Sequence, residues 1–459
     1  MTITPTVPGI FARQYLWTTI GANALIFLGA FEAMAVTTIM PTISRDLDGE
    51  SLYAVAFSGM LAASVIGMVI SGRWADRVGP IRPLITAVVV FVVGLLLSGI
   101  ALDMYTFIGG RILQGLGAGA INVALYVMVA RIYPAGMHPK IFGAFAAAWV
   151  LPSLVGPPVA GLVAESVGWH WVFFGVAALL VISAITMIPA LKQLHGMRSE
   201  AGAATSSRWT VLWAVVVSVA IVAISLGGES GAQFAWLLAA GAFVVVVIAL
   251  RPLGPRGTLT VRRGLPATVL LRGLVAAAFF STEVYLPYLL QERYGLPPWL
   301  AGLILTVGAL AWAGASAVQG RLGEHISHAA VMRVGTIMLM AGLAVQLVNA
   351  WLLLPVPVAA AGWLVAAAGM GLVFPRISTL VLGYSTERDQ GFNSAAVSIT
   401  DAAGGATAIA FAGLLFTAFG AAGGGFGAAL ALSAALAVAA VPVAFRVQER
   451  SDLRRVLAD

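Results

Sequence analysis

The stretch SGRWADRVGPIRP, residues 71–83, separates two long apolar runs and indicates how the chain is organised. The flanking runs, near 52–72 and 83–102, have the roughly 20 consecutive apolar residues that a membrane-spanning helix needs. The stretch is therefore predicted to be the loop of a two-helix hairpin at a membrane surface. Its arginines suit a cytoplasmic loop, whereas its aspartate and its spaced glycines require another reason.

The remainder of the chain is equally apolar. It has 459 residues, of which 60% are hydrophobic and 9% charged, whereas a soluble domain carries about 25% charged residues. The sequence predicts an all-α integral membrane protein with fourteen transmembrane helices, grouped as six, two and six. We expect these helices near residues 16–40, 52–72, 83–102, 105–130, 141–162, 171–190, 209–228, 232–250, 265–290, 298–320, 330–353, 356–383, 391–418 and 425–445.

The distribution of basic residues predicts the orientation. Most of the 25 Lys and Arg residues fall in loops that become cytoplasmic if the N-terminus is inside. We therefore expect a multi-pass protein of the cell membrane with both termini cytoplasmic, and a first helix that is retained rather than cleaved as a signal peptide. The net charge of +7 then follows from this bias and from attraction to anionic membrane lipids. A nucleic-acid partner is not needed to explain it.

A weak internal repeat indicates a transporter. The stretch QGRLGEHIS, residues 319–327, repeats in degraded form the order of glycine, arginine, glycine and acid found at residues 72–79. Two six-helix halves with such an echo are typical of transporters whose substrate site lies between the halves, near the middle of the membrane.

Four motifs in order resemble those of the major facilitator superfamily. GRWADRVGPIR (72–82) is similar to its loop signature, and RILQGLGAGA (111–120) to its Arg-Gln-Gly motif. WVLPSLVGPPVAG (149–161) is similar to the Gly-Pro motif associated with antiporters, and GWHWVFF (168–174) to the entry of the sixth helix. The resemblance implies six-helix bundles at 1–191 and 263–446, a linker at 192–262 with two extra helices, and a tail at 447–459.

The helix count and one acid resemble the fourteen-helix drug:proton antiporters in particular. In that family the first helix ends in an acid nine residues before a proline, and Glu32 and Pro41 have this spacing. Met34 and Thr37 depart from the family pattern. The resemblance implies a proton-coupled exporter of hydrophobic or amphipathic small molecules that works by alternating access.

Six charged residues fall within predicted helices, where each costs about 2.5–3.5 kcal/mol on insertion scales. They are Glu32, Arg111, Arg272, Glu283, Arg376 and Asp401. At 1.5 Å per residue, Glu32 and Arg111 have similar depths, as do Asp401 and Arg376, so Arg111 and Arg376 are the expected charge partners. Glu32, Glu283 and Asp401 are candidates for proton coupling, since a carboxyl group shielded from water can hold a proton and release it when the cavity exchanges faces. The alternative is that these pairs are structural and hold the two halves together.

The hairpin loop is a candidate conformational latch. Asp76 is expected near the start of the helix that begins around Gln390, where free amide groups and the helix dipole attract an anion. Such a contact would hold the outward-open state; the alternative is a solvated loop acid. The latch residues are Asp76, Arg77, Arg82, Gly72 and Gly79, and the antiporter-motif residues are Gly156, Pro157 and Gly161.

The expected cavity is aromatic rather than polar, which suits a hydrophobic or amphipathic substrate better than a sugar. Its candidate lining residues are Phe27, Phe31, Gln114, Asn122, Trp149, Phe279, Tyr285 and Phe374, each of which could instead serve packing. GLGAGA (115–120) is interpreted as close helix packing and not as a phosphate loop.

Enzyme and cofactor chemistry find no support in the sequence. The five histidines are expected in loops without metal-ligand spacing, and the chain has no cysteine, which excludes thiol catalysis. We expect a monomer that uses no cofactor other than protons as the coupling ion, and neither an enzyme nor an ATP-driven pump. A lipid or lipid-conjugate flippase and a non-transporting membrane sensor remain alternatives.

Overall fold

The computed structural model describes residues 9–134, 137–186, 208–227, 235–322, 326–386, 389–420 and 424–447. These residues form fourteen long helices, as the sequence predicts, and their bounds lie close to the expected ones. They are α1 (Leu16–Asp46), α2 (Tyr53–Val78), α3 (Ile81–Gly99), α4 (Met104–Ile132), α5 (His138–Ser166), α6 (His170–Thr186), α8 (Arg208–Gly227), α9 (Ala235–Leu250), α10 (Leu265–Tyr294), α11 (Pro298–Leu322), α12 (His328–Leu352), α13 (Val356–Tyr384), α14 (Gln390–Phe419) and α15 (Gly425–Ala444). Short 3-10 turns at Glu50–Leu52 and Arg251–Leu253 connect some of them.

Thirteen of these helices are long and apolar enough to cross a membrane; the fourteenth, α6, is apolar but has 17 described residues. A helix satisfies every backbone hydrogen bond internally, which is the condition for crossing a hydrocarbon layer. The fold class predicted from the sequence is therefore confirmed. The end of the sixth predicted helix, the whole segment 192–207 and the tail after Val447 lie outside the described residues.

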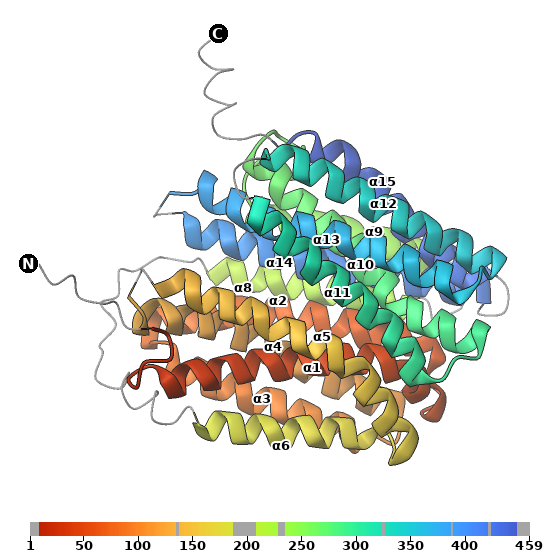
Figure 1. Ribbon diagram of the computed structural model, residues 1–459, viewed down its shortest axis with the longest axis horizontal. Helices are drawn as coiled ribbons and strands as arrows, with labels where there is room; N and C mark the ends of the chain where they lie inside the picture. Colours follow the sequence, from red (N-terminus) through yellow and green to blue (C-terminus); the bar gives the residue numbers. More distant parts are fainter. Residues whose placement is uncertain are drawn as a thin grey trace, which may run out of the picture.

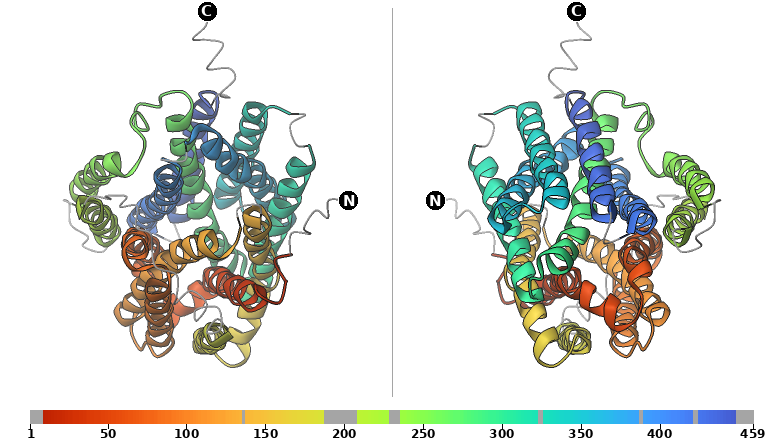
Figure 2. Two further views of the ribbon diagram at one scale, coloured as in Figure 1. Left: turned by 90° about the vertical axis from the view of Figure 1, so that its left-hand side faces the viewer. Right: turned by 90° about the vertical axis from the view of Figure 1, so that its right-hand side faces the viewer.

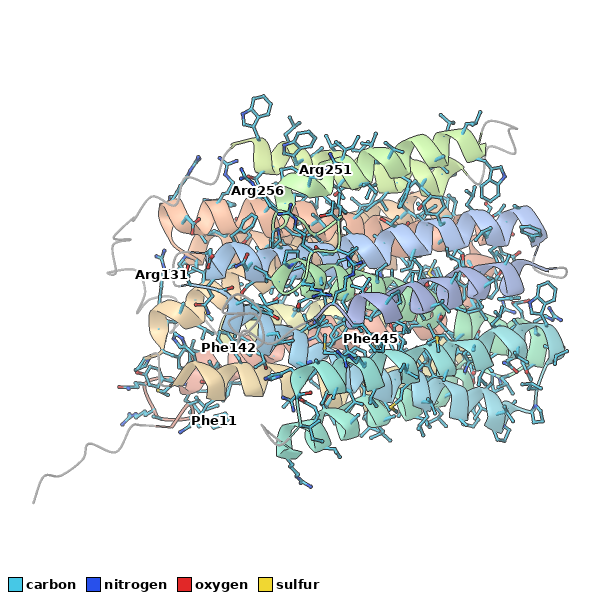
Figure 3. The ribbon with its side chains drawn as sticks, turned by 90° about the horizontal axis from the view of Figure 1, so that it is seen from above. Phe11, Arg131, Phe142, Arg251, Arg256 and Phe445 are labelled. Carbon is cyan, nitrogen blue, oxygen red and sulfur yellow. The ribbon has the colours of Figure 1, made fainter. Side chains whose placement is uncertain are left out.

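The helices form two bundles that lie one above the other (Figure 1). Helices α1–α6 make the N-terminal bundle and α10–α15 the C-terminal bundle, and each has its own buried apolar core. We call the end of the molecule at which α1 begins the proximal end, and the opposite end, with the α1–α2 and α10–α11 connections, the distal end. Arg131 and Phe11 both lie at the proximal end (Figure 3).

Helices α8 and α9 stand outside both bundles, on one side of the molecule (Figure 2). A third apolar cluster joins them to α2 and α14, which belong to different bundles. Ser218 of α8 donates to the carbonyl of Ala62 at 2.6 Å, and Ser225 exchanges a hydrogen bond with Ser58 at 2.7 Å. The two extra helices thus pack along the boundary between the bundles.

Glycines allow α2, α3 and α4 to approach each other closely. A Cβ atom at Gly117 would lie 2.7 Å from Phe91 Cβ of α3, and one at Gly94 would lie 2.7 Å from the backbone nitrogen of Gln114. Side chains at Gly115 and Gly119 would collide with the backbone of α2. The interpretation of residues 115–120 as a packing surface is therefore confirmed.

The hairpin between α2 and α3 is shorter than expected. Residues 72–78 continue α2, so Arg73, Asp76 and Arg77 lie on its last two turns, and the connection consists of Gly79 and Pro80. Gly79 ends the helix with φ +86, a conformation that disfavours residues with a side chain. The loop prediction was wrong because polar residues at a helix end that leaves the membrane look like a loop in the sequence.

Candidate functional site

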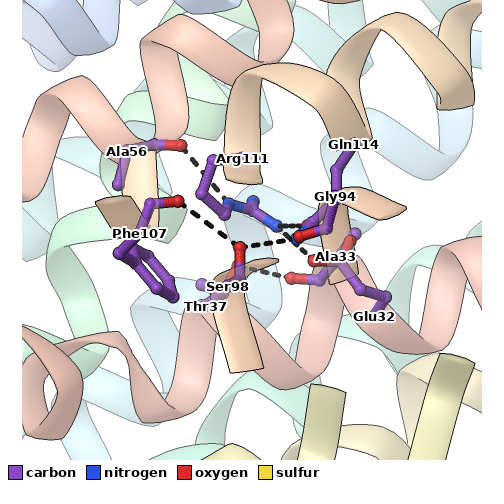
Figure 4. Close-up of polar contacts among 9 residues, drawn as sticks. All are labelled: Glu32, Ala33, Thr37, Ala56, Gly94, Ser98, Phe107, Arg111 and Gln114. Carbon is purple, nitrogen blue, oxygen red and sulfur yellow. Dashed lines mark hydrogen bonds and ion pairs between the residues drawn. The ribbon is translucent and has the colours of Figure 1, made fainter. Parts of the chain in front are cut away.

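A buried ion pair lies inside the N-terminal bundle. Glu32 of α1 and Arg111 of α4 are 1% and 2% exposed, and Nη1 of Arg111 donates to Oε1 of Glu32 (Figure 4). The pairing expected from depth is thus present. Oε2 of Glu32 is also buried and has no hydrogen-bond partner in the described part of the chain. The carboxyl group therefore has one oxygen bound to a cation and one that is unsatisfied.

Arg111 has acceptors other than Glu32. Its Nη1 also donates to Oε1 of Gln114 at 2.6 Å, and its Nε donates to the carbonyl of Ala56 at 3.4 Å. Nε2 of Gln114 in turn donates to Oγ of Ser98 at 2.9 Å and to the carbonyl of Gly94 at 3.2 Å (Figure 4). The network reaches α1, α2, α3 and α4, so that Arg111 keeps polar contacts when Glu32 is neutral.

This arrangement corrects the structural alternative for Glu32. Both members of the pair belong to one bundle, so the pair does not hold the two halves together. An unsatisfied buried carboxylate oxygen is costly, and a proton on Oε2 would remove the negative charge while leaving the Oε1 contact to Arg111 possible. The geometry can therefore support exchange of one proton.

Glu283 lies on α10, toward the distal end, and is partly exposed. Among the described residues, none forms a hydrogen bond or ion pair with its carboxylate. It follows Arg272 by eleven residues, close to three helical turns, so both lie on the same face of α10. Glu283 is thus an acid in a helix interior without a countercharge, as a proton-binding group would be.

The second charge pair differs from the expected one. Asp401 of α14 accepts from Nε of Arg272 at 2.6 Å, and not from Arg376. Arg376 instead contacts Nδ1 of His328 at 3.0 Å and donates to the carbonyl of Gln319 at 3.3 Å. The expected partner was wrong because equal depth does not fix the helix face: α14 presents Asp401 to α10, whereas α13 presents Arg376 to α11 and α12.

The antiporter motif lies where the two bundles cross. A Cβ atom at Gly161 of α5 would come within 2.6 Å of the backbone of Trp299 in α11, and one at Gly302 of α11 would come within 2.8 Å of Pro157. Gly156 faces α1, with Phe31 and Met34 at 3.5 Å. The motif therefore permits backbone contact between α5 and α11 at the distal end.

Thr306 of α11 completes this crossing, and the sequence analysis did not single it out. Pro157 and Pro158 lack N–H groups, so the carbonyls four residues earlier, at Ser153 and Leu154, lose their helical donors. The hydroxyl of Thr306 lies 3.3 Å and 3.1 Å from those two carbonyl oxygens. A donor from the C-terminal bundle thus serves acceptors that the N-terminal bundle cannot satisfy itself. In the sequence, the adjacent Pro157 and Pro158 were the indication that two carbonyls of α5 need a donor from outside the helix.

Further polar contacts join the bundles at the distal end. Gln291 donates to the carbonyl of Thr38 at 3.0 Å, Tyr53 donates to the carbonyl of Val284 at 2.8 Å, and α1 and α10 share an ion pair between Arg45 and Glu292 at 3.4 Å. The N-terminal core also continues into the distal parts of α10 and α14. The structure therefore represents a conformation that is closed at the distal end.

Asp76 lies at the proximal end of α2, exposed, with the charge of Arg131 nearby. Helices α2 and α14 run antiparallel, with Ala54 against Gly413 and Leu61 against Gly405. Extending this register places Asp76 at the level of Gln390, the first residue of α14. Arg77 and Arg82 are exposed at the same end, and the latch stays a prediction.

The expected cavity residues fall into two groups. Gln114 belongs to the Glu32–Arg111 network, Phe279 stacks on Trp363 at 4.5 Å, and Tyr285 packs against Tyr53 at 5.7 Å. These three are 0 to 2% exposed and line no surface in this conformation. Gln114 and Phe279 face the interior of their own bundles, whereas Tyr285 packs against the other bundle. The others are half-buried or exposed: Phe27, Phe31, Asn122, Trp149 and Phe374.

Sequence comparisons give a family and related transporters. The model of the Major Facilitator Superfamily matches residues 23–354. The multidrug efflux pump SdrM of Staphylococcus aureus (strain N315) is 24% identical over 64% of this chain and 66% of its own length. The multidrug transporter protein MdtP of Bacillus subtilis (strain 168) is 26% identical over 81% of this chain and 69% of its own length. The matched stretch thus spans about two thirds of these relatives.

Solved structures show the same fold. A POT family transporter in complex with a thioalcohol-conjugated peptide has a TM-score of 0.69 and 15% identity, and the match covers 95% of this chain and 96% of that one. A POT family transporter in complex with 5-aminolevulinic acid gives 0.68 and 14%, with the same coverage. Identities this low show the architecture alone. From the family model and the shared fold together, the chain belongs to the Major Facilitator Superfamily, as a transporter and not an enzyme.

Proposed function

We propose that the protein is a proton-coupled exporter of hydrophobic or amphipathic small molecules, and that Glu32 carries the coupling proton. The observation that carries this proposal is the state of the Glu32 carboxyl group, which is buried, bound to Arg111 through Oε1 and unsatisfied at Oε2. One relative described as a multidrug efflux pump and another described as a multidrug transporter support the substrate class.

In this proposal the proximal end is cytoplasmic, and the distal-closed structure is the state that receives substrate from inside. Glu32 is shielded from both sides here, so it would exchange its proton after the distal contacts open. Loss of that proton restores the full charge of the pair, and the Gln114 and Ala56 acceptors keep Arg111 in place throughout. Proton exchange would then alter the α1–α4 contact and not the fold of the bundle.

Asp76 has the complementary role in this proposal. When the distal end opens and the proximal end closes, the ends of α2 and α14 approach each other, and Asp76 would meet the free amide groups of α14. The latch would therefore stabilise the state in which Thr306 has released α5.

The test is transport by the purified protein in vesicles with an imposed pH gradient. Dyes from a panel of hydrophobic and amphipathic compounds of differing charge should accumulate in vesicles whose lumen is acidic, since protons leave as dye enters, and collapsing the gradient should abolish the accumulation. Dye accumulation that is the same with and without the pH gradient, or dye movement in the same direction as the protons, would contradict the proposal. A flux of every dye equal to its flux in vesicles without the protein would contradict it too.

A further inference from the structure

The charge pair of the C-terminal bundle is more accessible than that of the N-terminal bundle. The side chains of Arg272 and Asp401 are 14% and 23% exposed, against 2% and 1% for Arg111 and Glu32. Both pairs lie within membrane-spanning helices. Since charges at such depth face a bundle interior or a polar cavity, the exposed part of the Arg272 side chain is the part that a ligand could contact.

Arg272 is held in a fixed orientation with part of its donor set unused. Its Nε donates to Oδ1 of Asp401 at 2.6 Å, and its Cζ lies 3.4 Å from the ring centroid of Phe374. Within the described residues, neither Nη1 nor Nη2 has a hydrogen-bond partner, and neither is among the buried unsatisfied atoms. The two terminal nitrogens of a guanidinium form a planar fork that matches a carboxylate, sulfonate or phosphate.

Aromatic side chains of both bundles lie near Arg272. On the C-terminal side, Phe374 packs against Trp312 at 4.8 Å. On the N-terminal side, Tyr126 of α4 lies within electrostatic range of Arg272, is 49% exposed and stacks on Phe142 at 5.0 Å. Helices α4 and α10 are not among the closely packed helix pairs of the described residues. Aromatic side chains of both bundles therefore lie in the neighbourhood of Arg272.

We propose that Arg272 is the anion-binding group of the substrate site, and that the protein accepts amphipathic organic anions with an aromatic body. The proposal rests on the proposed transport function and narrows its substrate class. Asp401 acts as a positioning residue: it occupies Nε and so directs the Nη1–Nη2 edge to the ligand, while Phe374 covers one face of the guanidinium. Phe374, Trp312 and Tyr126 would contact the apolar part of the ligand.

The test compares two dyes that differ by one charged group. 1-Anilinonaphthalene-8-sulfonate carries a sulfonate, and N-phenyl-1-naphthylamine is the same aromatic body without it. Binding of each dye to the purified protein in nanodiscs is measured by fluorescence at constant pH, with empty nanodiscs subtracted. We expect Arg272→Gln to weaken binding of the sulfonated dye by about 10- to 100-fold, the range for loss of charge-assisted hydrogen bonds, and to leave binding of the neutral dye unchanged.

Control variants separate this effect from misfolding and from total charge. The double variant Arg272→Gln with Asp401→Asn leaves no unpaired charge and should show the same selective loss. Arg446→Gln removes a positive charge outside the bundle core, where Arg446 contacts the carbonyl of Val261, and should change neither dye. Equal loss of both dyes, or full retention of the sulfonated dye, would overturn the proposal. These binding measurements use no proton gradient. A result that overturns the anion-binding role of Arg272 is therefore distinguishable from one that overturns proton-coupled export.

Discussion

Replacing Thr306 with valine should destabilise the distal-closed state, because valine keeps the shape of threonine and removes only the donor. Thr306 is 5% exposed, and its hydroxyl serves the carbonyls of Ser153 and Leu154 at 3.3 Å and 3.1 Å. Those carbonyls have no helical donor, since Pro157 and Pro158 lack N–H groups. Leaving buried acceptors unsatisfied costs about 1–3 kcal/mol, which corresponds to a shift of about 5- to 150-fold toward the distal-open state.

The assay is cysteine accessibility, which suits a chain without native cysteine. Ala54, at the distal end of α2, packs against Gly413 of α14 in the other bundle and is 3% exposed, so Ala54→Cys should react with a membrane-impermeant thiol reagent only when the distal end opens. The reaction rate should rise by the factor above in the Thr306→Val background. Thr306→Ser keeps the hydroxyl and should react as the parent does. An unchanged rate in Thr306→Val would refute the account of this contact.

Three further perturbations have defined outcomes. Asp76→Asn should lower the same distal labelling rate, the opposite sign to Thr306→Val, while dye affinity stays constant; an unchanged rate argues against the latch. Gly161→Val places a side chain against the α11 backbone, at a typical overpacking cost of about 1–3 kcal/mol. The distal labelling rate should therefore rise and the transport rate should fall. The control Gly143→Val, where a Cβ meets nothing within 4 Å, should change neither rate. Hydrogen bonds from the side chain and backbone of Thr106 lower the pKa of Asp103, the N-cap of α4. The stabilising contribution of Asp103 is therefore present at neutral pH and lost as pH falls through that lowered pKa. Asp103→Ala should reduce the melting temperature at pH 7 and have little effect in strong acid, and an equal reduction at both pH values would exclude this linkage.

The architecture could be predicted because apolar runs and basic loops are local signals. Each span is encoded in about 20 neighbouring residues, and the depth of Glu32 and Arg111 along their helices was sufficient to pair them. Depth failed for Asp401, which pairs with Arg272, because a position along a helix does not say which neighbour the side chain faces.

The contribution of Thr306 could not be predicted for a different reason. A threonine in an apolar helix usually bonds to its own backbone, and only the folded chain brings it to the carbonyls that two prolines leave without donors. The same limit applies to Gln114, which was expected in a cavity and instead completes the contacts of Arg111. Networks that join several helices depend on packing that no single segment encodes.

The most direct test of proton coupling by Glu32 compares two transport modes in one variant. Glu32→Gln keeps an oxygen that can accept from Arg111 but cannot release a proton. We predict that its vesicles still exchange labelled dye for unlabelled dye at equal concentrations without a gradient, and that they lose accumulation driven by a pH gradient. Glu165→Gln, at an exposed acid of α5, should keep both activities. Gradient-driven accumulation by Glu32→Gln at the parent rate would contradict the central claim, and equal loss of both modes would show that Glu32 is needed for structure and not for coupling.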